Sequence, residues 1–442
     1  MNFGLTGNPL GHSFSKVIHE KLFNIKNIDN GYELFPSADL DCVFTETLSR
    51  LDGFNVTIPY KTDIIKYLDE VDEKVSLYNS CNTVVRKGNK YFGYNTDVYG
   101  FLNTLKNSNI ELNNNKVLVL GSGGVSRMMA FESALKGADV YITSRNIAKC
   151  LEIKEEILDK VNIKVEVIKE LSDESFDIVL NGTPCGMYPD ELSLPVSFEK
   201  IKDVPFVFDT IYNPRETLLT RLADFCGNKA ENGLYMLVEQ AAVAQKHFCG
   251  IEYSGKEVEE VVNKINIPPL KLNKNIILIG PPGSGKSTIG SKLAQILNLE
   301  FVDTDAEITK KHGRISDIFD KYGEKYFRQL ESETLNCLVK KNNQLISTGG
   351  GMVENLDVMN STKENCNNIF LFLNVSYDVL LSRTSQSNDR PLLKGDMTEK
   401  LKKLLDRRLP LYNKCADKTV NIDTEQDVEL TVIRCIDSLC NK

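Results

Sequence analysis

The stretch Asn275-Ile-Ile-Leu-Ile-Gly-Pro-Pro-Gly-Ser-Gly-Lys-Ser287 decides the fold of the C-terminal part of the chain. Its apolar start predicts a buried strand over 275–279, and the pattern over 288–297 predicts a helix directly afterwards. The segment 280–287 matches G-x-x-x-x-G-K-[ST], in which backbone N–H groups surround phosphate oxygens at a helix N-terminus. We therefore predict a phosphate-binding loop, with Lys286 against the phosphates and the Ser287 hydroxyl at a Mg²⁺ site.

A second unit of the same kind is Lys116-Val-Leu-Val-Leu-Gly-Ser-Gly-Gly-Val-Ser126. It is a variant of G-x-G-x-x-G with Ser126 in the third glycine place, set between a predicted strand and a predicted helix. This pattern predicts a dinucleotide site. The residues expected at it are Gly121, Ser122, Gly123, Gly124 and Val125.

The end of the next predicted strand, 139–143, bears on the choice of dinucleotide. It runs into Ser144, Arg145 and Asn146, with no carboxylate to hydrogen-bond a ribose 2′-hydroxyl. Arg145 is suited to a 2′-phosphate, so NADP(H) is preferred over NAD(H). A structural arginine at the strand end is the alternative.

Between and around these two units, short apolar runs alternate with helical patterns, which predicts an α/β fold with parallel sheets. The Pro268-Pro269 pair cannot continue a helix and favours an extended connection. We expect a first domain over 1–265, a linker over 266–273 and a second domain over 274–442. A loop inside one larger domain is the alternative.

The bulk composition narrows the class of protein. The chain has 442 residues with 41% hydrophobic and 26% charged, as expected for a globular protein. The net charge of −8 argues against nucleic-acid binding, and no apolar run reaches the length of a membrane span. The eleven cysteines include no C-x-x-C pair, which favours a reduced cytoplasm, and the four histidines suggest no metal centre. The oligomeric state stays open.

Two further features of the second domain are candidates for its site. Asp303 and Asp305 follow a short apolar run at i, i+2 spacing, so both carboxylates would point to one side of a strand end. One would assist Mg²⁺ and the other would accept a substrate hydroxyl, although a helix cap and a solvated turn fit equally well. The run Thr348-Gly-Gly-Gly351 would let a ligand approach bare backbone.

Taken with Phe327-Arg328, Glu331, Arg383, Arg390-Pro-Leu-Leu393 and Arg408-Leu-Pro-Leu-Tyr412, these residues resemble shikimate kinase over essentially the whole domain. The resemblance implies a P-loop nucleoside-monophosphate-kinase-like α/β domain with a parallel sheet, and ATP and Mg²⁺ as its nucleotide and metal. The implied ATP-binding residues are Gly283, Ser284, Gly285, Lys286, Ser287, Thr288, Arg383 and Arg390, the last on a lid. The implied metal residues are Ser287 and Asp303, and those implied for shikimate are Asp305, Arg328, Gly350, Gly351 and Arg408.

The N-terminal domain is similar to shikimate dehydrogenase over nearly its full length. The matching segments are Gly7-Asn-Pro-Leu-Gly-His-Ser-Phe-Ser15, Asn55-Val-Thr-Ile-Pro-Tyr-Lys61, Asn82-Thr83, Asn95-Thr-Asp97, Asn181-Gly-Thr183, Asp209-Thr-Ile-Tyr212 and Gly233-Leu-Tyr-Met-Leu-Val-Glu-Gln240. The resemblance implies an α/β substrate domain over 1–100 with about 235–265, and a Rossmann-type NADP-binding domain over 101–234. A departure from the family pattern, Tyr235 where glycine is more usual, bears on packing near the nicotinamide.

The same resemblance implies roles for single residues. Lys61 and Asp97 would form the catalytic pair, and Gly233 would lie near the nicotinamide. The residues implied for substrate binding are Ser13, Ser15, Asn55, Thr57, Lys61, Asn82, Asp97, Tyr212 and Gln240. A lysine beside a carbonyl is suited to supply the proton that a reduced ketone needs.

We therefore expect a bifunctional enzyme of small-molecule substrates: NADPH-dependent reduction of 3-dehydroshikimate to shikimate, followed by its MgATP-dependent phosphorylation. Two alternatives stay open. One is a broader quinate/shikimate dehydrogenase fused to a kinase, because the serine pair and the arginine pair would read any similar carboxylate. The other is a non-catalytic metabolite sensor, which would be expected to lack Lys61, Asp97, Lys286 or Asp305; all four are present.

Overall fold

The computed structural model describes residues 1–11, 13–172, 174–385, 397–425 and 427–440. The chain forms two compact units: Met1–Tyr188 with Asp203–Pro269, and Pro189–Lys202 with Leu270–Lys442. Each unit is described by itself below. The division between 269 and 270 lies at the Pro-Pro segment, and the domain bounds given above stay a prediction.

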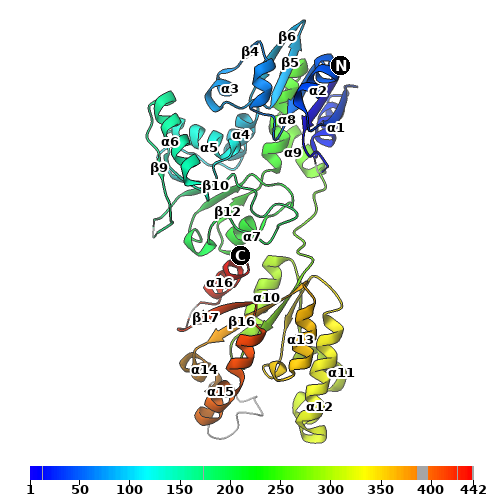
Figure 1. Cartoon of the computed structure of the whole chain (residues 1–442), viewed down its shortest axis with the longest axis vertical. Helices are drawn as coiled ribbons and strands as arrows, with labels where there is room; N and C mark the ends of the chain where they lie inside the picture. The colour runs from blue at the N-terminus through cyan, green and yellow to red at the C-terminus, as the bar shows by residue number, and fades with distance from the viewer. Residues whose placement is uncertain (12, 173, 386–396, 426, 441–442) are drawn as a thin grey trace. The chain divides into compact units, whose positions relative to one another are not determined.

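The first unit contains a mixed sheet of order β2-β1-β3-β5-β6-β4 (Figure 1). Its strands are β1 (Asn2–Gly7), β2 (Gly31–Pro36), β3 (Gly53–Val56), β4 (Glu70–Val71), β5 (Thr83–Lys87) and β6 (Lys90–Tyr94). β1 pairs in parallel with β2 and β3, whereas β5 pairs antiparallel with β3 and β6. The helices that accompany it are α1 (Ser15–Ile25), α2 (Leu40–Glu46), α3 (Glu73–Tyr78), α4 (Asp97–Asn107), α8 (Leu234–Cys249) and α9 (Gly255–Lys264).

Alternation along the strands explains which helices cover this sheet. Phe3 and Leu5 on β1 pack in one cluster with Phe23 of α1 and Phe248 of α8. Phe54 and Val56 of β3 pack in another cluster, with residues of α2. The chain thus returns after 234 to cover the sheet with which it began, which brings α8 beside α1 and α4.

A second sheet of the same unit is fully parallel, of order β12-β11-β10-β7-β8-β9. Its elements are β7 (Lys116–Leu120), α5 (Gly124–Leu135), β8 (Asp139–Thr143), α6 (Ile147–Val161), β9 (Glu166–Val167), β10 (Ile178–Asn181), β11 (Phe206–Asp209), α7 (Leu218–Phe225) and β12 (Lys229–Glu231). Counted from β7, the order is 3-2-1-4-5-6 across the sheet, the dinucleotide-binding topology whose ligand crevice lies beyond the carboxyl ends of β7 and β10. The predicted strands 116–120 and 139–143 are confirmed residue for residue.

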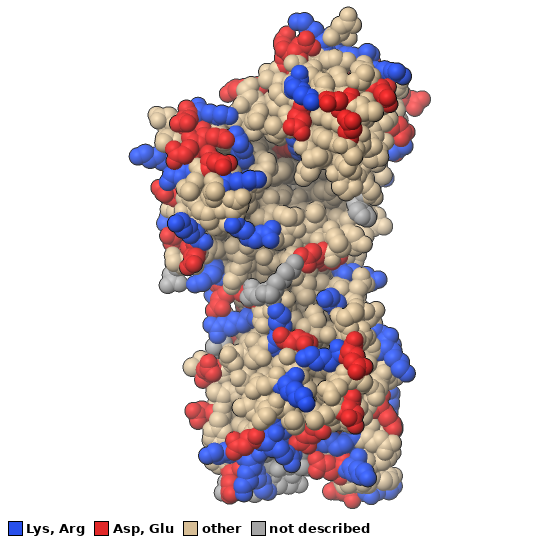
Figure 2. All heavy atoms as spheres, in the orientation of Figure 1, with Lys and Arg blue, Asp and Glu red and all other residues tan. Residues whose placement is uncertain are grey.

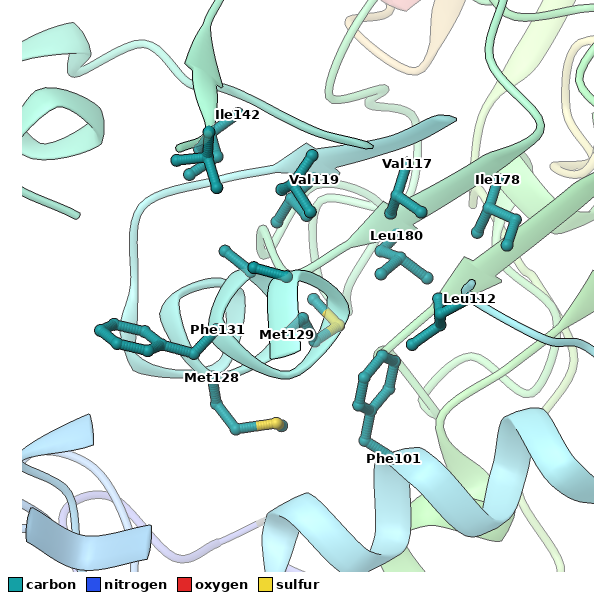
Figure 3. Packing of buried hydrophobic residues seen from close by; sticks show 14 of the residues in the cluster. Phe101, Leu112, Val117, Val119, Met128, Met129, Phe131, Ile142, Ile178 and Leu180 are labelled. Carbon is teal, nitrogen blue, oxygen red and sulfur yellow. The ribbon is translucent and has the colours of Figure 1, made fainter. Parts of the chain in front are cut away.

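The core of this sheet lies between its strands and helices α4, α5 and α6. Figure 3 shows Val117, Val119, Ile178 and Leu180 directed toward Met129 of α5 and Phe101 of α4. Phe101 is fully buried and its ring centroid lies 5.9 Å from that of Phe208. Through Phe101, α4 therefore packs against the parallel sheet that contains β7, β10 and β11.

The second unit contains a parallel sheet of order β14-β15-β13-β16-β17. Its elements are β13 (Asn275–Ile279), α10 (Lys286–Leu297), β14 (Glu300–Asp303), α11 (Thr304–His312), α12 (Ile315–Leu338), β15 (Gln344–Ser347), α13 (Leu356–Glu364), β16 (Asn368–Val375), α14 (Tyr377–Ser385), α15 (Met397–Cys415), β17 (Lys418–Ile422) and α16 (Val428–Cys440). Two fully parallel sheets and one mixed sheet, all accompanied by helices, confirm the predicted α/β class.

Residue alternation along β13 assigns the two faces of this sheet. Ile277 and Ile279 pack with Met359 of α13 and Tyr412 of α15. Leu278 faces the other way, where a Cβ on Gly290 of α10 would lie 2.9 Å from its Cδ1. α10 and α13 therefore cover opposite faces, and the carboxyl edge stays available for the loops that follow β13, β14 and β15.

On the face drawn in Figure 2, Lys and Arg are interspersed with Asp and Glu on each unit. Among the helices that the structure describes, none is both long and apolar enough to span a membrane.

Phe101→Ala removes the ring that joins α4 to the parallel sheet. We expect the local free energy of unfolding of α4 and α5 to fall by about 3–5 kcal/mol, because a fully buried aromatic ring leaves a cavity. Hydrogen exchange with mass spectrometry at increasing urea measures it on peptides of these helices. Leu151→Ala, at a side chain 46% exposed, should change it by less than about 1 kcal/mol; equal effects would contradict the assigned core.

Candidate active sites

The turn after β7 is shaped to receive an anion. Gly121 has φ +109°, and a Cβ there would lie 2.5 Å from the Ser126 hydroxyl oxygen. The N-cap of α5 is Gly123, and no side chain caps the helix. The first N–H groups of α5 are therefore available to a phosphate. Ser126 occupies the third glycine place with its hydroxyl donating to the Leu120 carbonyl at 3.3 Å.

The turn after β8 lies against this glycine turn. Ser144 Oγ donates to the Asn146 carbonyl at 2.9 Å and lies 3.2 Å from Ser122 Oγ. Asn146 caps α6 by accepting from the Lys149 N–H at 3.2 Å. Arg145 is exposed beside them. The structure thus brings the three residues predicted to select NADP(H) next to the predicted pyrophosphate turn.

A cavity of about 490 Å³ connects this turn with Lys61. Its lining residues are Ile58, Pro59, Lys61, Thr62, Tyr78, Asn79, Ser80, Ser122, Gly123, Gly124, Arg127, Lys149, Glu152 and Ile153. Arg127 and Lys149 were missed by the sequence analysis. Their signal was spacing, since Arg127 lies one turn into the helix after the glycines and Lys149 lies four residues after Arg145. Burial lowers the pKa of Arg127, which also pairs with Glu156.

Lys61 and Asp97 form a close ion pair. Lys61 Nζ donates to Asp97 Oδ2 at 2.6 Å, and the two side chains are 24% and 15% exposed. Asp97 is the first residue of α4, a place where the helix dipole favours a carboxylate. Its second oxygen, Oδ1, accepts from Asn82 Nδ2 at 2.8 Å. The predicted pair is therefore oriented from both sides.

Hydrogen bonds extend this pair into a group of predicted substrate residues. Asn82 Nδ2 also lies 3.4 Å from Gln240 Oε1 on α8. Asn55 Nδ2 donates to the Asn82 carbonyl at 3.1 Å and to Thr83 Oγ1 at 2.9 Å. Asn55 and Asn82 are 5% and 3% exposed. Residues from β3, β5, α4 and α8 thus meet in one buried polar cluster.

Ser13 and Ser15 form a second group at the start of α1. Ser13 Oγ donates to Ser15 Oγ at 3.2 Å, and no side chain caps α1. The ring of Phe14, between them, meets the ring of Tyr212 edge-on at 6.2 Å. Thr57 lies close to Gly7, the last residue of β1, since a Cβ on Gly7 would be 2.3 Å from Thr57 Cγ2. Two serine hydroxyls and free helix N–H groups suit a carboxylate.

Gly233 and Tyr212 are held by the backbone around Asp209. A Cβ on Gly233 would lie 2.0 Å from the Thr210 carbonyl oxygen, so only glycine fits there. Asp209 is fully buried and accepts from Thr217 Oγ1 at 2.6 Å, Asn181 Nδ2 at 2.9 Å and the Ile211 N–H at 3.1 Å. Burial raises the pKa of Asp209 from 3.8 to about 7, although these three donors oppose the change.

Asp209 makes the stability of the first unit depend on pH. Because its pKa is raised in the folded state, folding retains a proton that the unfolded chain releases, and this contribution is lost between about pH 4 and pH 7. We expect a slope of up to about 1.4 kcal/mol per pH unit that Asp209→Asn removes. Urea unfolding between pH 5 and 8, read by hydrogen exchange on β11, measures it. The exposed Asp159→Asn should keep the slope; an unchanged slope in Asp209→Asn would contradict this account.

The loop after β13 has the backbone of a phosphate cradle. Gly283 and Gly285 have φ +87° and +86°, and α10 begins at Lys286 without a side-chain cap. Lys286 is 9% exposed, and its Nζ donates to the carbonyls of Gly280 at 2.8 Å and Pro281 at 3.1 Å. Ser284 is buried and Thr288 is exposed. Such a loop directs N–H groups toward an anion.

Ser287 and Asp303 are adjacent, as predicted for metal residues. Ser287 Oγ donates to Asp303 Oδ2 at 2.7 Å. Asp303 Oδ1 accepts from the N–H groups of Asp305 at 3.0 Å and Ala306 at 3.2 Å, so the same carboxylate also caps α11. Asp303 is therefore the N-cap of α11, and its role at a metal ion stays a prediction. A hydroxyl and a carboxylate beside a phosphate loop fit Mg²⁺, which prefers a few protein oxygens plus phosphate.

Of the two arginines predicted to bind ATP, the structure describes Arg383 on α14. A Cβ on Gly285 would lie 3.8 Å from Arg383 Nη1, which places Arg383 over the phosphate loop. Its Nε donates to Glu425 Oε1 at 3.1 Å. Arg390 lies outside the described residues.

Each of the three glycines after β15 lies against a different neighbour. A Cβ on Gly349 would lie 2.2 Å from Glu331 Oε1, one on Gly350 would lie 2.9 Å from Pro282 Cδ, and one on Gly351 would lie 2.2 Å from Arg328 Nη1. The glycine run therefore lies beside Pro282 of the phosphate loop. The carboxylates of Glu331 and Asp305 and the guanidinium of Arg328 lie against the same run.

Asp305, Arg328 and Glu331 form the buried charged part of this place. Arg328 Nη1 donates to Glu331 Oε2 at 2.6 Å, and Nη2 donates to Glu324 Oε1 at 2.8 Å. Burial raises the pKa of Glu331 to about 7 and also raises that of Asp305, which Asp303 raises further. Asp305 Oδ1, Glu331 Oε1 and Arg328 Nε are buried and have no hydrogen-bond partner among the residues that the structure describes.

Arg408 approaches the glycine run from α15. It is 1% exposed, its Nε donates to Glu354 Oε1 at 2.6 Å, and its Nη2 is buried with no partner in the described ranges. Tyr412, one turn later, donates to the Gly350 carbonyl at 2.5 Å. Burial raises the pKa of Glu354, but Arg408 and Arg407 outweigh it, so the net change is downward. Glu354 could not be predicted from the sequence, because nothing near it in the chain marks it as a partner of Arg408.

Comparison with known proteins agrees with this geometry. The family model described as "Shikimate dehydrogenase substrate binding domain" matches residues 5–84, and "Shikimate kinase" matches residues 282–439. The NADP(+)-dependent shikimate dehydrogenase of Shouchella clausii is 35% identical over 267 residues, 59% of this chain and 97% of that protein. That of Clostridium perfringens strain 13 is 36% identical over 269 residues, with 60% and 97% covered.

Solved structures give the same result. A shikimate dehydrogenase crystallised with NADP⁺ superimposes with a TM-score of 0.56 at 35% identity, covering 60% of this chain and 96% of that one. A chorismate mutase/shikimate 5-dehydrogenase fusion from Clostridium acetobutylicum gives 0.55 at 38%, with 60% and 96% covered. The chain therefore belongs to the shikimate dehydrogenase family in its N-terminal part, and its C-terminal part is a shikimate kinase domain.

Proposed function

We propose that this chain reduces 3-dehydroshikimate to shikimate with NADPH and then phosphorylates shikimate with MgATP. The observation that carries the first activity is the single cavity lined by Lys61 and by the glycine turn Ser122–Gly124. For the second activity it is the convergence of the phosphate loop, Asp305 and Arg328 on the three glycines.

At the first site the chain's own residues would bind the substrate and deliver a proton. NADPH, when bound, supplies the hydride. Lys61 Nζ, held by Asp97 at 2.6 Å, would protonate the alkoxide oxygen that the hydride transfer creates. Ser13 and Ser15 would bind the substrate carboxylate, and the group of Asn55, Asn82 and Gln240 would bind its hydroxyls.

Arg145 and Lys149 support NADP(H) over NAD(H). They lie at the carboxyl end of β8, beside Ser144 and Asn146, where a ribose 2′-phosphate would be placed in this topology. Arg145 in the turn 144–146 and Lys149 in the first turn of α6, with no carboxylate in the turn, favour the additional phosphate charge.

At the second site the work is positioning and charge neutralisation. Lys286 would turn from the loop carbonyls to the phosphates of ATP, with Ser287 and Asp303 holding Mg²⁺. Asp305 Oδ1, buried and without a partner, would accept the proton of the attacking substrate hydroxyl.

The buried polar atoms of the second site indicate which chemical groups its ligand would carry. Within the described part of the chain, Arg328 and Arg408 each have one buried N–H group without a partner, which suits an acceptor such as a carboxylate. Within the same part, Asp305 and Glu331 each have one buried oxygen without a partner, which suits a hydroxyl donor. A ring acid with several hydroxyls, such as shikimate, supplies both.

A broader quinate/shikimate specificity for the first site is the second candidate, because Ser13 and Ser15 would bind either acid. Steady-state rates with shikimate and quinate, each with NADP⁺ and NAD⁺, separate the two. Shikimate with NADP⁺ should give the highest kcat/KM, and a preference for quinate with NAD⁺ would overturn the proposed substrate. A sensor without turnover would show no rate with any pair. We place the reactions in the cytoplasm, because the cysteines include no C-x-x-C pair and fit a reduced compartment.

Lys61→Ala should lower the dehydrogenase kcat by about 10²–10⁴-fold, because it removes the proton donor. The kinase activity of the same chain should stay within about twofold. NADPH oxidation and ADP formation, measured on one preparation, give both rates. Lys66→Ala is a matched control, since Lys66 is exposed and pairs with Asp41 at 2.8 Å. Loss of both activities in Lys61→Ala would contradict separate sites.

Lys286→Ala should have the reciprocal effect. Kinase kcat should fall by at least about 10²-fold, since one charge on the transferring phosphoryl group is lost, while the dehydrogenase rate stays unchanged. Lys292→Ala on the exposed side of the same helix is the control. Retention of more than a tenth of the kinase rate in Lys286→Ala would contradict the assigned ATP site.

A further inference from the structure

The polar cluster around Lys61 and Asp97 continues behind Asn55 into a part of the fold that the proposed chemistry does not use. Tyr32 of β2 donates its hydroxyl to Asn55 Oδ1 at 2.7 Å, inside the protein. Tyr32 is 1% exposed and Asn55 is 5% exposed. Asn55 is thus held from two sides, by Tyr32 on its oxygen and by β5 on its nitrogen.

His19 of α1 supports the ring of Tyr32. The two rings are stacked with centroids 3.9 Å apart and an interplanar angle of 9°, and His19 is fully buried. Burial lowers the pKa of His19 to about 3, so the ring is neutral at physiological pH. A neutral ring is the form that packs against a tyrosine without a buried net charge.

Gln245 of α8 fixes the orientation of His19. Its amide Nε2 lies 3.1 Å from His19 Nδ1 and donates to the His19 carbonyl at 3.0 Å. Because an amide nitrogen only donates, His19 Nδ1 accepts and the ring proton lies on Nε2. Gln245 Oε1 in turn accepts from the Tyr253 hydroxyl at 2.5 Å. These contacts join α1, β2 and α8 behind the predicted site.

The arrangement selects one of the two orientations of the Asn55 amide. In the observed orientation, Nδ2 donates to the Asn82 carbonyl and to Thr83 Oγ1, while Oδ1 accepts from Tyr32. The reversed amide would set Oδ1 against the Asn82 carbonyl, which is two acceptors face to face. Without the Tyr32 hydroxyl, the amide oxygen would lose the donor that lies 2.7 Å from it, and the side chain would be held less firmly in this orientation.

We propose that Tyr32 is a positioning residue of the dehydrogenase site: its hydroxyl, backed by His19 and Gln245, holds the Asn55 amide in the orientation that meets a substrate hydroxyl. The inference rests on the proposed function, in which Asn55 contacts shikimate. Tyr32 itself touches no reacting atom. Its effect should therefore fall on substrate affinity more than on turnover.

The test is Tyr32→Phe in the full chain, which keeps the stacked ring and removes one hydroxyl. We expect KM for shikimate to rise about tenfold, the scale of one buried hydrogen bond. The values of kcat and of KM for NADP⁺ should stay within about threefold. Tyr91→Phe is the matched control, because its hydroxyl donates to the Ser49 carbonyl at 3.3 Å on the same sheet, outside the cluster; it should leave all three constants unchanged.

A double-mutant cycle with Asn55→Ala separates positioning from general support. If Tyr32 acts through Asn55, Tyr32→Phe added to Asn55→Ala should raise KM for shikimate by less than twofold. Effects that multiply would overturn the proposal, as would a fall of kcat together with a loss of NADP⁺ affinity and melting temperature, which would mean a structural role. A wild-type chain without shikimate turnover would instead refute the proposed function, whereas a normal wild type with an unaffected Tyr32→Phe refutes only this inference.

Discussion

Both units place a glycine turn between a buried parallel strand and the first turn of a helix, and the candidate sites depend on that turn. Gly121 and Gly285 have φ +109° and +86°, a backbone region that side chains with a Cβ rarely adopt. No side chain caps α5 or α10, so the first N–H groups of each helix are available to a phosphate. Anion binding is thereby built into the backbone, and the neighbouring side chains need only orient the second reactant.

The two sites solve that second task with buried charges, in different ways. At the first, Lys61 and Asp97 pair directly, and Asn82 takes the remaining carboxylate oxygen. At the second, Arg328 and Arg408 each keep an internal carboxylate partner, Glu331 and Glu354, because a buried guanidinium without a counter-ion is costly. Each arginine nevertheless retains one buried N–H group without a partner among the described residues, so in the proposed function a substrate carboxylate would add to the pair instead of replacing it.

Features that depend on neighbouring residues in the chain could be predicted from the sequence. The strands 116–120 and 275–279 and the helices after them were predictable, since apolar runs, glycines and helix starts are neighbours in the chain. The mixed sheet of the first unit was not, because the antiparallel β5 and β6 and the return of α8 depend on pairing between distant segments. For the same reason, the contact of Glu354 with Arg408 could not be predicted. The contacts of His19 with Tyr32 and Gln245 could not be predicted either. Residue roles such as those of Lys61 and Asp305 came from family resemblance, and the structure adds the distances that make them chemically sensible.

One measurement tests the proposal of two consecutive reactions most directly. The purified full chain is given 3-dehydroshikimate, NADPH, Mg²⁺ and ATP, and NADPH, ADP and the organic products are followed together. If the chain catalyses both reactions, we expect NADPH oxidation to be followed by ADP formation. At the end, one shikimate 3-phosphate should have formed for each NADPH and each ATP consumed. NADPH oxidation with shikimate accumulating and no ADP formed, or no NADPH oxidation at all, would contradict it.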